Sequence, residues 1–196
     1  MIGPNTTHVT LLERVAKADD HAAWTEFCER YGPLIRSFAR RRHVRSGEID
    51  DIMQDVLMIL SKSMQDFEYD PSKGKFRSYL KTLVIRAVYR KTFQKKSPVL
   101  LEDIDAAIDP AKDDPETEAI WEEEWRQHHV RQAMRIIAIE YNEQDQNAFE
   151  YYAVQGRSAQ ETADELGINV DQVYKAKSRI LKRLSELIRQ QVDEEG

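Results

Sequence analysis

Nine lysines and arginines, and no acid, lie between residues 73 and 96, in the stretch KGKFRSYLKTLVIRAVYRKTFQKK. The same stretch contains four aromatic residues, Phe76, Tyr79, Tyr89 and Phe93. Aromatic rings stack on unpaired bases and cations contact phosphates, so this combination is typical of a surface that binds single-stranded nucleic acid. The alternative is that the aromatic side chains pack against a neighbouring helix and that the cations form its solvated rim.

A second candidate for nucleic-acid binding is the segment 158–183, SAQETADELGINVDQVYKAKSRILKR. Ser158 followed three residues later by Glu161 predicts a capping box at the start of a short helix. Gly167 predicts the end of that helix, and Asn169 predicts the cap of the next one. A short helix, a glycine turn and a basic helix are the plan of a DNA-reading helix-turn-helix. A plain helical hairpin with a solvated charged face is the alternative.

Helical spacing on the second of these helices predicts which side chains face DNA. Val173 and Ile180 fall on the inner side, whereas the polar and basic residues point away from the core. Glutamine, arginine and lysine side chains suit base edges and phosphates of the major groove. The candidates for this contact are Gln172, Lys175, Ser178, Arg179 and Lys182.

The elements that position these residues are predicted to be helices. Apolar residues recur at helical spacing from Leu12 to Phe38, and Asp19 or Asp20 is predicted to cap the middle helix there. A further helix is predicted from about Gly47, with one apolar stripe made of Ile49, Ile52, Met53, Val56, Leu57 and Leu60. Residues 67–75 predict a loop. Residues 76–94 predict a helix whose inner face is Phe76, Leu80, Leu83, Val84 and Ala87.

An acidic segment separates the two basic ones. Residues 102–124 contain eleven acids and a single lysine. Residues 97–118 predict a linker, and Pro115 predicts the first turn of a new helix that continues to about Ile139. Two interpretations of the acidic run remain open: it shields the basic faces of the isolated chain, or it is a flexible solvated spacer.

Composition limits the function classes. The chain has 196 residues, a formal net charge of −6 and 41% hydrophobic residues, which indicates a soluble, foldable protein. Cys28 is alone, which excludes an intramolecular disulfide. We see neither a signal peptide nor the roughly 20 apolar residues of a membrane helix, so we expect no membrane insertion and a cytoplasmic location. We predict no enzymatic activity, metal or cofactor, because the histidines match no zinc spacing and no phosphate loop is present.

The two basic segments, in this order, resemble the sigma-70 family of bacterial transcription initiation factors, specifically its extracytoplasmic-function (ECF) group. DDIMQDVLMIL, residues 50–60, is similar to the helix with which the family binds polymerase. GKFRSYLKTLVIRAVYRKTFQKK is similar to its segment for promoter melting and −10 recognition, although Tyr79 stands where tryptophan is customary and Arg86 where asparagine is common. The helix-turn-helix resembles the family's −35-recognition domain.

The resemblance implies an all-α fold of two small helical domains. It assigns region 2 to residues 8–96, an acidic linker to 97–118, and region 4, with its helix-turn-helix, to 119–192. It also implies partners and site residues. The partners are core RNA polymerase, through its β′ clamp helices, and promoter DNA; the family is often held by an anti-sigma protein, which no residue here identifies. The implied polymerase contacts are Asp51, Gln54 and Asp55, and the implied −10 contacts are Phe76, Arg77, Tyr79, Arg86 and Arg90.

Two other classes stay open on the sequence alone. A helix-turn-helix regulator could bind duplex DNA without joining polymerase, but it leaves the 50–60 helix and the 73–96 segment unexplained. A helical adaptor is the other, and it predicts no salt-dependent association with DNA. Asp51, Gln54 and Asp55 could likewise be solvated polar residues on an amphipathic helix.

Overall fold

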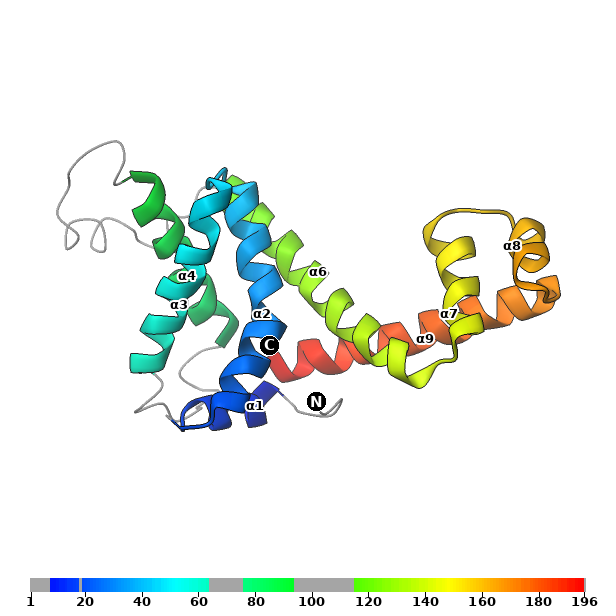
Figure 1. The fold of residues 1–196 in the computed structure, drawn as a ribbon, viewed down its shortest axis with the longest axis horizontal. Coiled ribbons are helices and arrows are strands. Elements are labelled where there is room, and N and C mark those ends of the chain that lie inside the picture. The colour runs from blue at the N-terminus through cyan, green and yellow to red at the C-terminus, as the bar shows by residue number, and fades with distance from the viewer. Residues whose placement is uncertain (1–7, 18, 64–75, 94–114, 196) are drawn as a thin grey trace. The chain divides into compact units, whose positions relative to one another are not determined.

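The computed structural model describes residues 8–17, 19–63, 76–93 and 115–195, and in these ranges the chain forms helices and turns and no strand (Figure 1). The predicted all-α fold is therefore confirmed. The chain divides into two compact units, residues 1–128 with 194–196, and residues 129–193. The predicted loop at 67–75 and the predicted linker up to residue 114 lie outside the described residues.

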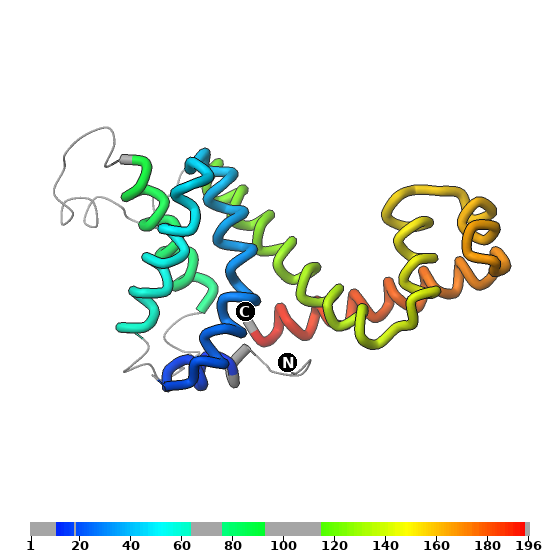
Figure 2. The backbone as a smooth tube through the Cα atoms, in the orientation of Figure 1, coloured from blue at the N-terminus to red at the C-terminus, as the bar shows by residue number. Residues whose placement is uncertain are grey.

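Unit 1 is a bundle in which consecutive helices pack against one another. Helix α2 packs against α1 and α3, and α3 packs against α4 (Figure 2). A short 3₁₀ turn precedes α3, so the helix predicted from Gly47 begins slightly later as an α-helix. The elements are α1 (His8–Val15), α2 (His21–Arg41), the 3₁₀ turn (Ser46–Glu48), α3 (Ile49–Ser63) and α4 (Phe76–Phe93).

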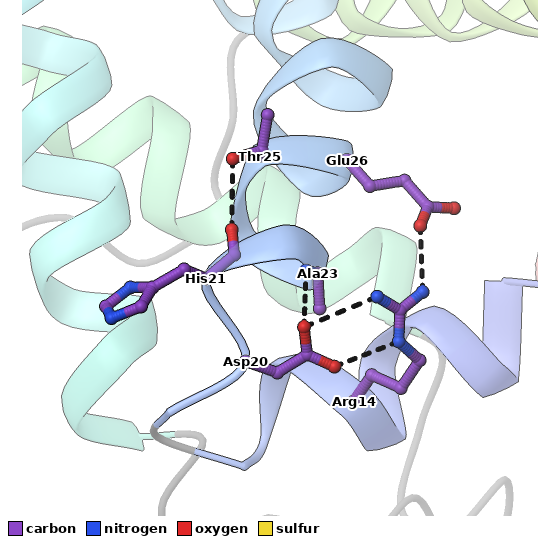
Figure 3. Close-up of polar contacts among 6 residues, drawn as sticks. All are labelled: Arg14, Asp20, His21, Ala23, Thr25 and Glu26. Atoms are coloured by element: carbon purple, nitrogen blue, oxygen red, sulfur yellow. Dashed lines mark hydrogen bonds and ion pairs between the residues drawn. The ribbon is translucent and has the colours of Figure 1, made fainter. Parts of the chain in front are cut away.

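The start of α2 is fixed by Asp20, one of the two predicted caps (Figure 3). Its carboxylate accepts a hydrogen bond from the Ala23 N–H at 2.8 Å. Arg14 on α1 donates to Asp20 at 3.0 Å and to Glu26 at 2.9 Å. The Arg14 hydrogen bond, followed by the Ala23 N–H, holds the pKa of Asp20 below its usual value. The same carboxylate thus caps α2 and joins it to α1.

The end of α2 is fixed by a left-handed residue, His43, with φ of 58°. The His43 N–H donates to the Arg40 carbonyl at 3.0 Å, and the Val44 N–H donates to the Ala39 carbonyl at 3.1 Å. This pair of bonds is a Schellman motif, in which glycine is the usual left-handed residue. Val44 is buried, which adds the apolar contact that commonly accompanies the motif.

The core of unit 1 contains the apolar stripe predicted for α3. Ile49, Ile52, Met53, Val56 and Leu60 are buried, and Leu57 is half-buried against the same core. Burial of side chains of this size is worth about 1.5–3 kcal/mol each, so the stripe is a main source of stability for the bundle.

Helix α6 (Pro115–Glu140) begins at the predicted proline and belongs to both units. Its first half carries Ile120, Trp121 and Trp125, which are buried in the core of unit 1. The structural division therefore falls after His128, whereas the sequence placed a boundary at residue 119. The difference arises because the three apolar side chains pack with unit 1; the assignment of the domains to regions 2 and 4 stays a prediction.

Unit 2 contains the predicted helix-turn-helix. Beyond the second half of α6, its elements are α7 (Glu143–Phe149), a π-helical turn (Glu150–Val154), α8 (Ala159–Leu166) and α9 (Val170–Glu195). Two groups of buried side chains hold it together. One joins α6, α7 and α9 through Ala133, Ile137, Phe149, Ile180 and Leu187, and the other joins α8 and α9 through Ala159, Ala163 and Val173.

Candidate nucleic-acid interface

Helix α4, which carries the basic and aromatic stretch, is buried on more than its predicted inner face. Phe76, Leu80, Leu83, Val84 and Ala87 are buried as expected. Ile85 and Val88 are buried as well. The apolar residues therefore surround much of the helix, and the surface left for nucleic acid is narrower than the sequence indicated.

Phe76 does not lie on that surface. Its side chain is 3% exposed. The ring lies 5.6 Å from Tyr31 and 6.1 Å from Phe27, between centroids, the latter edge to face. A ring enclosed by core aromatics cannot stack on a base from this position. The prediction that Phe76 contacts the −10 strand is therefore corrected: it packs in the core and positions the start of α4.

The two tyrosines of α4 are half-buried and pack against the core of unit 1. The Tyr79 hydroxyl donates a hydrogen bond to Ser63 Oγ, 2.7 Å away, at the end of α3. Much of each tyrosine ring thus packs within the protein, as the alternative interpretation of the aromatic residues predicted. The Phe93 side chain lies outside what the structure describes.

Arg77 and Lys81, on the first turns of α4, are paired with acids of α6. Arg77 forms an ion pair with Glu122, and Lys81 forms one with Glu118. The Arg77 guanidinium also lies over the Trp125 ring, 5.3 Å from its centroid. Sequence reasoning missed these contacts, since the partners are 45 and 37 residues apart. The sequence feature that pointed to them was the opposite charge of the segments 73–96 and 102–124.

The remaining cationic candidates of α4, Arg86 and Arg90, are half-buried. The Arg86 Nε is buried and has no hydrogen-bond partner among the described residues. A buried donor of this kind costs free energy unless it is satisfied. Arg86 is therefore the −10 candidate with an unmet bonding requirement in this structure.

The polymerase candidates lie together on α3. Asp51 and Gln54 are exposed and Asp55 is half-buried. Lys91 of α4 donates to the Asp51 carboxylate at 2.9 Å, and this hydrogen bond raises the pKa of the Lys91 ammonium. The preceding acid, Asp50, pairs instead with Arg36 of α2 at 3.2 Å. The three candidates thus form one polar surface beside the end of α4.

The caps predicted for the helix-turn-helix are confirmed. Ser158 Oγ accepts from the Glu161 N–H at 3.1 Å, and the Glu161 carboxylate accepts from the Ser158 N–H at 2.9 Å. The bonds from Ser158 hold the pKa of Glu161 below its usual value. Gly167 has φ of 64°, the left-handed conformation that ends α8. Asn169 accepts from the Gln172 N–H at 2.9 Å and caps α9.

The outer face of α9 carries the five side chains predicted to contact duplex DNA, and they differ in their contacts within the protein. Lys175, Ser178 and Lys182 are exposed. The Gln172 side chain accepts from the Asn169 N–H at 2.9 Å, so it takes part in the helix cap. Arg179 pairs with Asp145 at 2.7 Å, although its side chain remains 58% exposed. Three of the five are thus open to a ligand, and two already have partners.

An aromatic and cationic group beside the helix-turn-helix was not anticipated. Tyr174 of α9 is exposed and lies edge to face with Tyr152 of the π-helical turn, 5.5 Å between centroids. The Lys177 ammonium lies 4.8 Å from the Tyr152 centroid. The spacing of Tyr174 and Lys177 could have signalled one helix face, but a π-helical turn has no signature in apolar periodicity.

Within the described ranges, no group of three or more histidine, cysteine, aspartate or glutamate side chains could hold a metal ion. A search of the same residues also finds no helix long and apolar enough to cross a membrane.

Comparison with known proteins identifies part of the chain. Residues 27–97, which include most of α2 and all of α3 and α4, match the family model described as Sigma-70 region 2. No curated protein matches the chain. Among solved structures, the chain is similar to one described as CnrH in complex with the cytosolic domain of CnrY, at 19% identity and a TM-score of 0.35, over 93% of this chain and 97% of that one. That score is too low to decide anything about the fold.

Proposed function

Because residues 27–97 match the family model for Sigma-70 region 2, we propose that the chain is a transcription initiation factor of the sigma-70 family, ECF group, which binds core RNA polymerase and directs it to specific promoters. The observation that carries the proposal is the match over residues 27–97, the same segment that places the polar surface of α3 beside the basic helix α4. A factor of this kind performs no covalent chemistry, and its work is recognition.

Polymerase is bound by Asp51, Gln54 and Asp55 of α3. Their spacing places them on one face of the helix, turned away from the buried stripe. The support is their position on the matched segment, and the exposure of Asp51 and Gln54. The partner is the β′ clamp helices, to which this surface offers two carboxylates and an amide.

The opened −10 strand is bound by the outer surface of α4. Arg77, Arg86 and Arg90 supply positive charge for phosphates, and Tyr79 supplies a ring edge beside them. Arg86 is half-buried, and its Nε has no hydrogen-bond partner among the described residues. Phe76 contributes indirectly, since its packing between Phe27 and Tyr31 fixes where α4 begins.

The −35 duplex is bound by α9 of the helix-turn-helix. Its second helix enters the major groove, as in other proteins of this plan, with Lys175, Ser178 and Lys182 toward the DNA. Arg179 exchanges Asp145 for a phosphate or a guanine edge. The Gln172 side chain either keeps its hydrogen bond to the Asn169 N–H or gives it up to bond a base edge. Each good base contact is worth about 1–3 kcal/mol of discrimination.

The test is run-off transcription from a promoter library with core RNA polymerase, in the presence and absence of the purified chain. Transcripts that start only when the chain is added support the proposal, and their upstream sequences define the −35 and −10 elements. Salt-dependent binding to duplex DNA without polymerase association would favour the helix-turn-helix regulator instead. Absence of both activities would leave a helical adaptor.

A further inference from the structure

The first half of α6 places three acids against cations of unit 1. Glu118 pairs with Lys81 and Glu122 pairs with Arg77, both on α4, and Glu124 accepts from Arg41 of α2 at 3.3 Å. Two of the three cations thus belong to the helix to which we assign the −10 strand. The acidic residues of α6 occupy the positive groups that the strand's phosphates would contact.

Apolar side chains hold this segment in place. Trp121 is fully buried and meets Phe38 edge to face, 5.4 Å between centroids. Trp125 is also buried, and it stacks on the neighbouring Trp121 at 5.8 Å. Glu118, Trp121, Glu122 and Trp125 are spaced three and four residues apart, so they share one face of α6. The buried tryptophans therefore hold the two acids of this face in a fixed position toward α4.

The surroundings of Arg77 match what single-stranded nucleic acid would supply. A carboxylate, that of Glu122, bonds the guanidinium, and the Trp125 ring covers it. A bound strand would offer a phosphate for the first contact and a base for the second. Only 24% of the Arg77 side chain and 18% of the Lys81 side chain remain exposed. For Arg77, α6 thus supplies both a carboxylate in place of a phosphate and a ring in place of a base, and for Lys81 it supplies a carboxylate.

We propose that residues 118–125 of α6 are an internal competitor for nucleic acid at the Arg77 and Lys81 end of α4. The free chain then binds single strands weakly, and movement of this segment of α6 away from α4 exposes the site. This inference rests on the proposed −10 role of α4. It goes beyond the choice between shield and spacer, because it assigns specific carboxylates to specific cations and gives the tryptophans a part in the competition.

The experiment compares the double variant Glu118→Gln, Glu122→Gln with a control of equal charge, Glu13→Gln, Glu116→Gln. Glu13 and Glu116 are exposed and form no ion pair among the described residues. Both variants of the full chain change the net charge equally. Affinity for a fluorescein-labelled oligothymidylate is measured by anisotropy over a series of salt concentrations, and circular dichroism verifies that helix content is unchanged.

The competitor variant is expected to bind the oligonucleotide about 2- to 30-fold more tightly than the wild type, since two partly exposed ion pairs no longer compete. Its dependence of log K on log salt should steepen by about 1.4, because two more cations reach phosphates. The control should change far less in affinity and not in slope. Adding Arg77→Ala and Lys81→Ala to the competitor variant should abolish the gain.

Equal gains in oligonucleotide affinity for both double variants would mean that only net charge matters. No gain for the competitor variant would mean that the ion pairs serve only the structure. Either result overturns the inference. Run-off transcription by the same proteins separates this failure from failure of the function. Transcription without any gain in oligonucleotide binding contradicts the competitor alone. A gain that Arg77→Ala and Lys81→Ala removes, without transcription, supports the competitor and contradicts the sigma role.

Discussion

Charge reversal on α3 tests whether its polar surface binds polymerase or merely faces solvent. The change is Asp51→Lys, alone and combined with Asp55→Lys, and the matched control for Asp51→Lys is Asp50→Lys. Asp51 loses Lys91 as a partner and Asp50 loses Arg36, in ion pairs of similar length on the same turn of helix. The two changes thus remove comparable contacts within the protein while altering different faces of α3.

The cost to stability can be worked from exposure. The Asp51 side chain is 54% exposed, so its ion pair contributes about 0.2–1 kcal/mol. Placing a cation in the first turn of α3 opposes the helix dipole by a further 0.3–1 kcal/mol or so. Reversal at Asp50 or Asp51 is therefore expected to cost about 0.5–2 kcal/mol, which a domain with a typical unfolding free energy of about 5–15 kcal/mol tolerates. Thermal unfolding should remain cooperative in both variants.

The effect on polymerase binding should be larger and specific. Removing a charge that pairs across a buried interface costs about 2–5 kcal/mol, which is about 30-fold or more in affinity. We expect this loss for the Asp51 and Asp55 variant and a much smaller one for Asp50→Lys, measured by binding to immobilised core polymerase. Adding Lys91→Glu to Asp51→Lys restores an ion pair within the chain but should not restore polymerase binding. Equal losses in the variant and its Asp50 control, or rescue by Lys91→Glu, would refute the assignment.

Three further predictions concern stability. His43→Gly should stabilise the chain by about 0.5–1 kcal/mol, because glycine adopts the left-handed conformation without a steric cost; a lower midpoint in denaturant would contradict this. Ser158→Ala should destabilise the chain by about 1 kcal/mol through loss of the capping box with Glu161, and weaken −35 duplex binding, whereas Ser158→Asp should retain most of both. The Arg183 hydrogen bonds lower the pKa of Glu140, so they stabilise the fold above its unfolded pKa of about 4.3 and are lost as pH falls through the folded value. The difference in unfolding free energy between wild type and Glu140→Gln should therefore shrink from pH 7 to pH 3, and a constant difference would exclude this origin.

Local features of this fold were predictable, because their causes lie within a few residues. Ser158 and Glu161 are three residues apart and cap each other, and Gly167 ends the helix that they begin. Asp20 caps α2 for the same reason. The apolar stripe of α3 follows from helical spacing alone. In the caps, both residues of the contact lie within a few positions of each other. In the stripe, the spacing of the apolar residues alone indicates which side chains are buried.

The contacts of the surface proposed to bind the −10 strand were not predictable in this way. Helical spacing indicates that one side of α6 is apolar, but it does not say which helix covers Trp121. Arg77 was predicted as a nucleic-acid contact from its charge, and its pairing with Glu122 depends on tertiary packing. Phe76 illustrates the same limit, since a ring at the edge of a basic stretch suits either a base or a core, and only burial distinguishes them.

The packing of α6 also has an optical consequence. Of the three tryptophans of the chain, Trp121 and Trp125 are enclosed by the core of unit 1, while Trp24 is half-buried. Indole emission shifts to longer wavelength when water reaches the ring, so a movement of α6 out of unit 1 would change the emission colour of the protein without unfolding any helix. The chain thus carries an intrinsic fluorophore at the segment whose position decides whether α4 is accessible.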